Sequence, residues 1–414
     1  MFKNTLRSLS RGVRLLEKNG PREFSSRAAY FLIRRKIVPA VNQFVEPHVL
    51  SETNVREICH ARDSFFGYYG SADSVSVTNP QTPHKLGEET VEALRSKYPE
   101  TIPIPEPYVC ELQDASLLGP EAIAKISAGY PKGDLSITGI SNGVILALSR
   151  GVLPTGGFAL GGAERYGRVV PLVGEYARTY FHWFQDYLPR LKGVEYYVER
   201  TGNRPKLLVP AEPPRWMRDS LLAMGYDEST WSTWSGDCGR VDRLIFPTVQ
   251  IESPEAFDRA RFPAPSTYQW LSRRIKKGIS PTSTRDHSPR VYISRDDATE
   301  RQVENEAAVM ELLDEFGFER YRLSDLSFAE QVTLFRDADS IVGPHGGGFI
   351  NMIYADDPTI IELFGPKKRY GTPGHMYQIA QCLGYEYGCV EGATVGRNLR
   401  VDTEKLETLL DRML

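Results

Sequence analysis

The sequence contains few cysteines and no long hydrophobic run, and each absence excludes a class of protein. No uninterrupted apolar run approaches the roughly 20 residues of a membrane-spanning helix, so we expect a soluble or peripheral protein. The 5 cysteines are scattered, odd in number and without the CxxC spacing of a metal site. This pattern favours free thiols in a reducing compartment over a disulfide framework, and it predicts no zinc site. We therefore expect a cytoplasmic protein, either free or peripheral at the inner face of the cell membrane.

Length and composition indicate a folded protein with more than one domain. The chain has 414 residues, of which 41% are hydrophobic and 25% charged, and this balance argues against disorder. A chain of this length exceeds the usual size of one hydrophobic core, so two domains are expected. We find no internal repeat and no low-complexity tract.

The first 36 residues are strongly basic, although the whole chain has a net charge of only −3. They carry 10 Lys or Arg against Glu17 and Glu23, a net charge of +8 that leaves −11 for the remainder. Apolar residues recur at helical spacing from Phe2 to Leu16, until Asn19-Gly20-Pro21 ends the pattern. The segment lacks the apolar core and cleavage site of a secretory signal. It predicts a basic amphipathic helix that either lies on an anionic membrane or packs on the body of the protein.

The rest of the chain divides into three parts. Residues 51–105 show no sustained period, and short strands are predicted at 108–112, 135–138 and 143–148, so we interpret 51–167 as an irregular and β-rich segment. Residues 168–265 and 266–414 each alternate helices with buried strands, and a helix from Tyr180 to Tyr197 is expected to kink at Pro189. The predicted fold class is α/β, with two Rossmann-like halves facing a cleft after the basic helical segment 1–50.

A glycine-rich turn follows one of these predicted strands. The run from Ser340 to Asn351 passes from apolar residues to His345 and then to Gly346, Gly347 and Gly348. Such a turn lets the backbone approach a phosphate, and a helix starting near Phe349 would direct its free N–H groups at the same point. The next strand, 359–364, places Glu362 in an apolar run, where it could hold ribose hydroxyls or close the strand locally. His345 could donate to a diphosphate or be an ordinary loop histidine.

Two further groups could carry chemistry. His182 and Asp186 lie four residues apart and share a helix face, so they could activate a hydroxyl, form a helix-to-strand hydrogen bond, or contribute to a metal site that has no third ligand in view. Arg295 follows the strand 290–294, and Arg301 and Asn305 come soon after. An arginine at a strand tip can bind phosphate, although it could also pair with the neighbouring acidic residues.

Taken in order, these segments resemble the glycosyltransferase family 61 domain. The resemblance covers about residues 168–395, and the sequence departs from the family in having Gly347 where alanine is frequent. It implies a GT-B enzyme that transfers a sugar from a nucleotide-sugar to a hydroxyl acceptor with inversion and without a metal or other cofactor. It also implies donor-side roles for Arg295 and the turn from His345 to Gly348, and an acceptor-side role for His182 and Asp186. The predicted donor-binding set is Arg295, Arg301, Asn305, His345, Gly346, Gly347, Gly348, Asn351 and Glu362.

We therefore expect an inverting glycosyltransferase in the synthesis of a surface polysaccharide or glycoprotein glycan. Asp186 is the first candidate for the base and His182 the second. The expected partners are a nucleotide-sugar, a glycan or glycolipid acceptor and an anionic membrane bound through residues 1–36, with no nucleic acid. Two alternatives are a nucleotide- or glycan-binding protein without catalysis, which the acid at position 186 disfavours, and a metal-dependent phosphate-ester hydrolase, which the missing third ligand disfavours.

Overall fold

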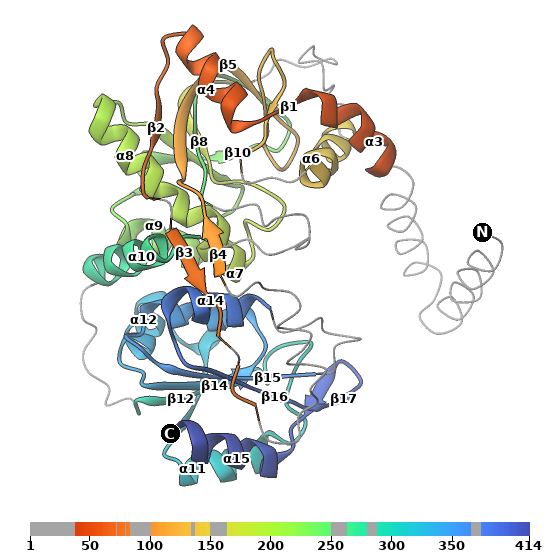
Figure 1. Ribbon diagram of the computed structural model, residues 1–414, viewed down its shortest axis with the longest axis vertical. Helices are drawn as coiled ribbons and strands as arrows, with labels where there is room; N and C mark the ends of the chain where they lie inside the picture. Colours follow the sequence, from red (N-terminus) through yellow and green to blue (C-terminus); the bar gives the residue numbers. More distant parts are fainter. Residues whose placement is uncertain are drawn as a thin grey trace, which may run out of the picture.

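The computed structural model describes residues 38–71, 73–78, 80–82, 101–133, 137–149, 164–249, 263–279, 288–365 and 374–414. Two β-sheets lie one above the other along the long axis, with helices between them (Figure 1). The mixed α/β class is confirmed. The predicted basic helix from Phe2 to Leu16 lies outside the described residues. Among the residues that are described, no helix has the length and apolar character needed to cross a bilayer.

The N-terminal sheet combines a parallel and an antiparallel part. Its order is β10-β9-β8-β11-β5-β2, with β6 also paired to β5. The strands β8, β9, β10 and β11 run parallel to their neighbours in this group, whereas β5 is antiparallel to β11 along most of its length. Residues on both sides of position 168 therefore share one sheet. The bounds are β2 (Phe66–Tyr68), β5 (Tyr108–Leu118), β6 (Ile123–Lys125), β8 (Glu164–Pro171), β9 (Lys206–Pro210), β10 (Trp231–Trp234) and β11 (Cys238–Pro247).

Two predictions for the segment before residue 168 were wrong. The strand expected at 143–148 is replaced by a helix, α6 (Ile137–Ser149), which also includes the last two residues of the strand expected at 135–138; the first two lie outside the described residues. Its residues Ile140, Val144 and Ala147 are buried at helical spacing, and a short apolar run by itself does not distinguish a buried helix from a strand. The connector expected at 51–105 contains α4 (Glu52–Ala61), which begins with a capping box between Ser51 and Asn54.

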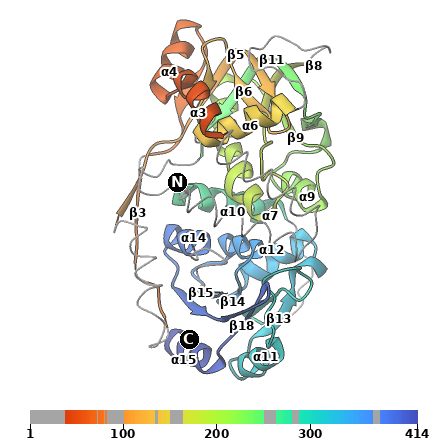
Figure 2. The ribbon, with the colours of Figure 1, turned by 90° about the vertical axis from the view of Figure 1, so that its right-hand side faces the viewer.

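The C-terminal sheet is fully parallel and has the order β13-β12-β14-β15-β16. Helices α12 and α14 cover one face and α11 and α15 the other (Figures 1 and 2). The strands predicted at 290–294 and 359–364 are confirmed, because fully buried parallel strands have continuous apolar sequences. The bounds are β12 (Arg290–Ser294), α11 (Glu306–Glu315), β13 (Glu319–Arg322), α12 (Phe328–Arg336), β14 (Ser340–Pro344), β15 (Thr359–Phe364), α14 (His375–Leu383), β16 (Tyr387–Glu391) and α15 (Thr403–Met413).

An irregular helix follows β8 and leads to β9 in the N-terminal sheet, and its first part packs against the C-terminal half. It consists of α7 (Tyr180–His182), a π-helical turn η3 (Trp183–Tyr187), a 3-10 turn η4 (Leu188–Arg190) and α8 (Leu191–Thr201). The helix expected from Tyr180 to Tyr197 is present, but it leaves α-helical geometry from Trp183 to Arg190, and Pro189, which supplies no N–H, lies in the 3-10 turn. Helices α9 (Arg215–Ala223) and α10 (Pro265–Gly278) lie in the same layer.

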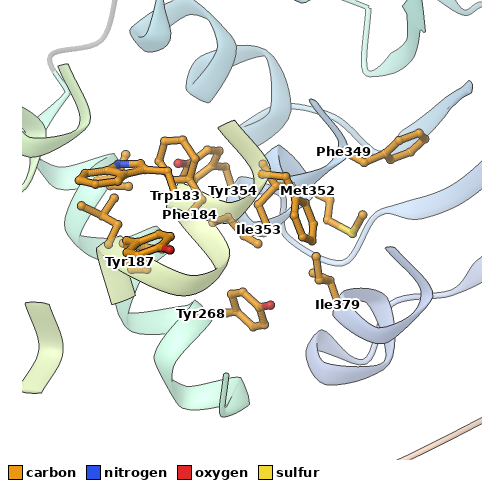
Figure 3. Close-up of a cluster of buried hydrophobic side chains, with 14 of the residues drawn as sticks. Trp183, Phe184, Tyr187, Tyr268, Phe349, Met352, Ile353, Tyr354 and Ile379 are labelled. Carbon is orange, nitrogen blue, oxygen red and sulfur yellow. The ribbon is translucent and has the colours of Figure 1, made fainter. Parts of the chain in front are cut away.

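One aromatic core joins the halves through this layer. Trp183 and Phe184 from η3 pack with Tyr268 from α10 and with Tyr354 from the C-terminal half (Figure 3). The rings of Phe184 and Phe328 stack with centroids 5.6 Å apart. Fully burying one such ring contributes about 1.5–3 kcal/mol, so the shared core holds the two sheets together.

The described residues also contain shorter elements. A hairpin of β3 (Asp73–Ser76) and β4 (Thr101–Ile104) leaves the N-terminal half and lies beside α14 (Figures 1 and 2). The others are α3 (Val38–Val45), η2 (Glu46–His48), β1 (Val49–Leu50), β7 (Tyr130–Pro131), η5 (Glu228–Thr230), η6 (Leu323–Asp325), η7 (Gly347–Tyr354), β17 (Ala393–Val395) and β18 (Asn398–Arg400).

Candidate active site

The carboxyl ends of β12 and β14 meet at one edge of the parallel sheet. These two strands are direct neighbours in register, so Arg295, which follows β12, and His345, which follows β14, lie at the same edge. Glu362 belongs to β15 and pairs in register with Gly343. The topology therefore brings together three residues that the sequence separates by up to 67 positions. Ligands of open α/β sheets bind at this edge.

His345 is held by a buried carboxylate. Its Nδ1 atom is hydrogen-bonded to Oε1 of Glu362, and the other oxygen of Glu362 accepts from the hydroxyl of Tyr387. Glu362 is 0% exposed, whereas the His345 side chain is 20% exposed. Since a carboxylate accepts, Nδ1 of His345 carries the proton, and Nε2 is the nitrogen left for a ligand. The structure therefore gives Glu362 a supporting position behind His345.

Arg295 lies against the glycine turn. A Cβ placed on Gly346 would come within 2.3 Å of Nη1 of Arg295, so only glycine leaves room for the guanidinium here. Nη2 of Arg295 donates to the carbonyl of Glu300 at 3.3 Å, and Nε is buried without a hydrogen-bond partner among the described residues. Burial, followed by the nearby charge of Arg301, lowers the pKa of Arg295. A concentrated positive charge of this kind is suited to an anionic ligand.

The helix after the glycine turn differs from the prediction. It is the 3-10 helix η7, which begins at Gly347, instead of a helix starting near Phe349. Gly346 is extended, with φ −175°, and the residues from Phe349 to Tyr354 are all buried, so burial in the interdomain core fixes the helix. The alanine that the family often has at Gly347 would fit, because its Cβ would lie 3.5 Å from the nearest atom.

Asn351 occupies the interface between the halves. It is 0% exposed, its Oδ1 accepts from the hydroxyl of Tyr180 at 2.7 Å, and its Nδ2 donates to Gln331 at 3.0 Å. Desolvation by burial raises the pKa of Tyr180, so its hydroxyl stays protonated. Asn351 therefore links the two halves, and a buried amide satisfied by two side chains does not support the donor contact predicted for it.

Arg301 and Asn305 lie beside the edge in structural positions. Arg301 has a left-handed backbone, with φ +62°, and its N–H donates to the carbonyl of Arg397 at 2.9 Å. The side-chain amide of Asn305 exchanges two hydrogen bonds with the backbone of Val401, both at 2.9 Å. Asn305 thus joins the start of α11 to the segment before α15, and this structural position does not support the donor-side role predicted for it.

His182 and Asp186 form a second pair, at the end of α7 and in the π-turn that follows. Nδ1 of His182 lies 2.7 Å from Oδ2 of Asp186, and the two side chains are 29% and 20% exposed. The ring of Tyr176 stacks on His182 with centroids 4.8 Å apart. The predicted sharing of a face is confirmed, although the helix is α-helical only to His182 and then becomes a π-turn. π-turns are frequent at functional sites.

Phe181 borders both the glycine turn and the His182–Asp186 pair. A Cβ added to Gly347 would lie 3.5 Å from the Cβ and 3.6 Å from the backbone N of Phe181. The ring of Phe181 meets that of His182 edge to face, with centroids 5.2 Å apart. The residue therefore touches the glycine turn of one half while flanking the histidine of the other.

The sequence analysis missed His375, which opens helix α14. Its ring lies 5.5 Å from that of Phe181. Desolvation lowers the pKa of His375, and the charges of His345 and His182 lower it further. Nothing in the local sequence marks His375, because only the packing of α14 beside Phe181 places it in the group.

This arrangement is typical of α/β proteins that bind an anionic ligand at the edge of a parallel sheet. Within the described parts of the chain, no group of three or more His, Cys, Asp or Glu side chains could hold a metal ion.

Comparison with known families makes the assignment specific. The model for the family described as Glycosyltransferase 61 matches residues 180–361. These residues form a glycosyltransferase family 61 domain, and this domain indicates a glycosyltransferase. The resemblance that the sequence motifs predicted is thus confirmed over a span that includes His182, Asp186, Arg295 and the glycine turn. No curated protein matches the chain.

Proposed function

We propose that the protein transfers a sugar from a nucleotide-sugar to a hydroxyl of a glycan or glycolipid acceptor, with inversion at the anomeric carbon. The observation that carries the proposal is that Phe181 borders the glycine turn of the Arg295–His345 edge and also flanks His182, which places the His182–Asp186 pair near that edge. One side suits a leaving diphosphate and the other an attacking hydroxyl. The two sheets would correspond to the acceptor and donor halves of a GT-B enzyme.

On the nucleotide-sugar side, three kinds of hydrogen-bond donor would neutralise the charge of the diphosphate. The guanidinium of Arg295 supplies a permanent charge, and Nε2 of His345 would donate to the diphosphate when the ring is protonated on both nitrogens, with Nδ1 held by Glu362. The first N–H groups of η7, at Gly347 and Gly348, lack acceptors inside the helix. Donors arranged before the reaction stabilise charge as it develops on the leaving group, so these residues would assist departure of the diphosphate without a metal.

On the acceptor side, we assign the base to His182 and an orienting role to Asp186. The carboxylate occupies Nδ1 of His182, so Nε2 is available to take the proton of the acceptor hydroxyl. This assignment reverses the order suggested by the sequence, which placed Asp186 first. The same carboxylate would stabilise the imidazolium formed when the proton is transferred.

The biological setting is proposed from the sequence. The basic segment 1–36 suits an anionic bilayer, and a glycan or glycolipid held there would present its hydroxyl to the enzyme. We propose synthesis of a surface polysaccharide or glycoprotein glycan by a cytoplasmic enzyme at the inner face of the membrane.

The test is nucleoside-diphosphate binding by matched arginine variants. Thermal-shift measurements with a panel of nucleotide-sugars would first identify a donor, because a ligand of the folded state raises its stability. Arg295→Ala should then weaken binding of the corresponding diphosphate by about 1.5–3 kcal/mol, the loss expected for a hydrogen bond to a charged group. Arg290→Ala is the control, since Arg290 lies at the opposite end of β12 and donates to Phe316. Equal affinity of both variants would remove Arg295 from the donor site.

A further inference from the structure

An arm from the N-terminal half crosses onto the C-terminal half. We define the arm as residues 77, 78 and 80–82, which continue from β3. Both the N–H and the hydroxyl of Thr78 donate to Oε1 of Gln381, at 2.7 and 2.9 Å. The carbonyl of Thr78 accepts from the hydroxyl of Tyr377, and the carbonyl of Thr82 accepts from Arg412 at 2.8 Å. The arm is therefore anchored to α14 and α15.

Between these anchors, the arm extends the parallel sheet. The N–H of Gln81 donates to the carbonyl of Tyr387 at 2.8 Å, and the N–H of Cys389 donates back to Gln81 at 3.0 Å. The contact is a parallel bridge to Gly388. It satisfies backbone groups of β16, which would otherwise form an open edge. The position of β16 thus depends on a segment more than 300 residues earlier in the chain.

The side chain of Tyr387 points from this edge strand to the candidate site. It is 2% exposed, and its hydroxyl donates to Oε2 of Glu362. Burial, followed by the charge of Glu362, raises the pKa of Tyr387, which keeps the hydroxyl a donor. The ring of Tyr377, itself bonded to the arm, packs against that of Tyr387 with centroids 5.3 Å apart.

We propose that Tyr387 is a positioning residue for His345, acting through Glu362, and that the arm holds Tyr387 in place by pairing with its backbone. Without the hydroxyl of Tyr387, a fully buried carboxylate loses one of its two side-chain donors, and it would turn or bind a proton to recover one. Either change releases Nδ1 of His345. The consequence for donor binding rests on the proposed function, but the geometric relay itself does not.

The relay can be tested without any ligand by proton NMR of the histidine rings. An imidazole N–H bonded to a buried carboxylate exchanges slowly and resonates far downfield, and the resonance of His345 is identified by its loss in His345→Gln. Tyr387→Phe should shift or abolish that resonance. The matched control is Tyr385→Phe, which removes a hydroxyl bonded to the carbonyl of Ala355 at 2.8 Å and should leave the resonance unchanged.

The part played by the arm is tested by two substitutions. Gln81→Pro removes the N–H that pairs with Tyr387 and should move the His345 resonance in the direction seen for Tyr387→Phe. Thr78→Val removes only the hydroxyl bonded to Gln381, so the resonance should stay close to that of the wild type. An unmoved resonance in Gln81→Pro would overturn the role of the arm, and an unmoved resonance in Tyr387→Phe would overturn the relay.

Calorimetry with UDP and GDP then connects the relay to donor binding. Tyr387→Phe should bind the preferred nucleotide about tenfold more weakly than the wild type, the size expected for losing one hydrogen bond of a buried polar group. Tyr385→Phe should bind it normally. If the wild type binds neither nucleotide, the donor role of this edge fails, while the NMR result still decides the relay. If the wild type and Tyr387→Phe bind equally, the positioning role is overturned and the proposed function stands.

Discussion

Gly346 allows Arg295 to be displaced without changing any charged residue. A Cβ at position 346 would lie 2.3 Å from Nη1 of Arg295 and 3.1 Å from its Cζ atom, whereas ordinary contacts begin at 3.4 Å. In Gly346→Ala the guanidinium must therefore retreat by about 1 Å. The backbone itself accepts alanine, because Gly346 is extended at φ −175°. The substitution thus tests the position of one charge.

The expected effect follows from that displacement. A misplacement of about 1 Å can reduce the function of a site by roughly 100-fold. Loss of hydrogen bonds to a charged group costs about 1.5–3 kcal/mol, which corresponds to an affinity lower by roughly 13- to 160-fold. Both arguments predict that Gly346→Ala binds the nucleoside diphosphate between ten and a few hundred times more weakly than the wild type.

The matched control is the next residue. A Cβ at Gly347 would lie 3.5 Å from Phe181, an ordinary contact, so Gly347→Ala should bind nearly as the wild type does. Titration calorimetry measures the affinities, and thermal unfolding shows that both variants are folded. Unchanged affinity in Gly346→Ala would refute the placement of Arg295 at the diphosphate. Equal losses in both variants would instead mean that the turn tolerates no side chain at all.

Three further outcomes are expected. Asp186→Asn should leave donor binding nearly unchanged and lower turnover by about 100-fold or more, as for loss of assisted base catalysis. Turnover that survives would show that His182 acts without the help of Asp186. Because the folded pKa of His375 is below 6.5, the unfolded state binds more protons as the pH falls through about 6.5, so the free energy of unfolding should decrease toward acid. Urea unfolding at several pH values should show a smaller decrease for His375→Gln, and an identical pH dependence would contradict this account. Sedimentation should show that the protein binds anionic but not neutral vesicles, with about 1 kcal/mol of attraction per basic residue near the surface. Salt should weaken this binding. Deletion of residues 1–20 should abolish vesicle binding, whereas transfer to a soluble acceptor should continue. Binding to both kinds of vesicle would indicate apolar insertion alone.

The local sequence pattern and the order of elements along the chain were sufficient to predict much of the C-terminal half. Continuous apolar runs marked β9, β12 and β15, and Ser327 with Glu330 forms the capping box that begins α12. Because parallel strands place their carboxyl ends at one edge, the meeting of Arg295 with His345 could be expected before the structure was known. The pairing of His182 with Asp186 followed from helical spacing, although the π-turn between them did not.

Several features could not be read from local pattern. The apolar run of α6 fits a strand equally well, and its contact with Ile123 decides in favour of the helix. Asn351 stands next to a glycine turn that suggests a ligand contact, yet the hydroxyl of Tyr180 reaches it from the other half. A short sequence motif cannot identify a residue whose hydrogen-bond partner lies about 170 positions away in the chain.

By itself, the sequence determined the α/β class, the family 61 domain and most of the residues at the sheet edge, because these depend on periodicity and on motifs of a few residues. Tertiary structure alone decided which of those residues face the open edge and which support it. Glu362 stands behind His345, Tyr387 and the arm stand behind Glu362, and His375 joins the group from α14. The physical reason is that hydrogen bonding and burial depend on distance in space, and long-range packing brings together groups that no local pattern relates.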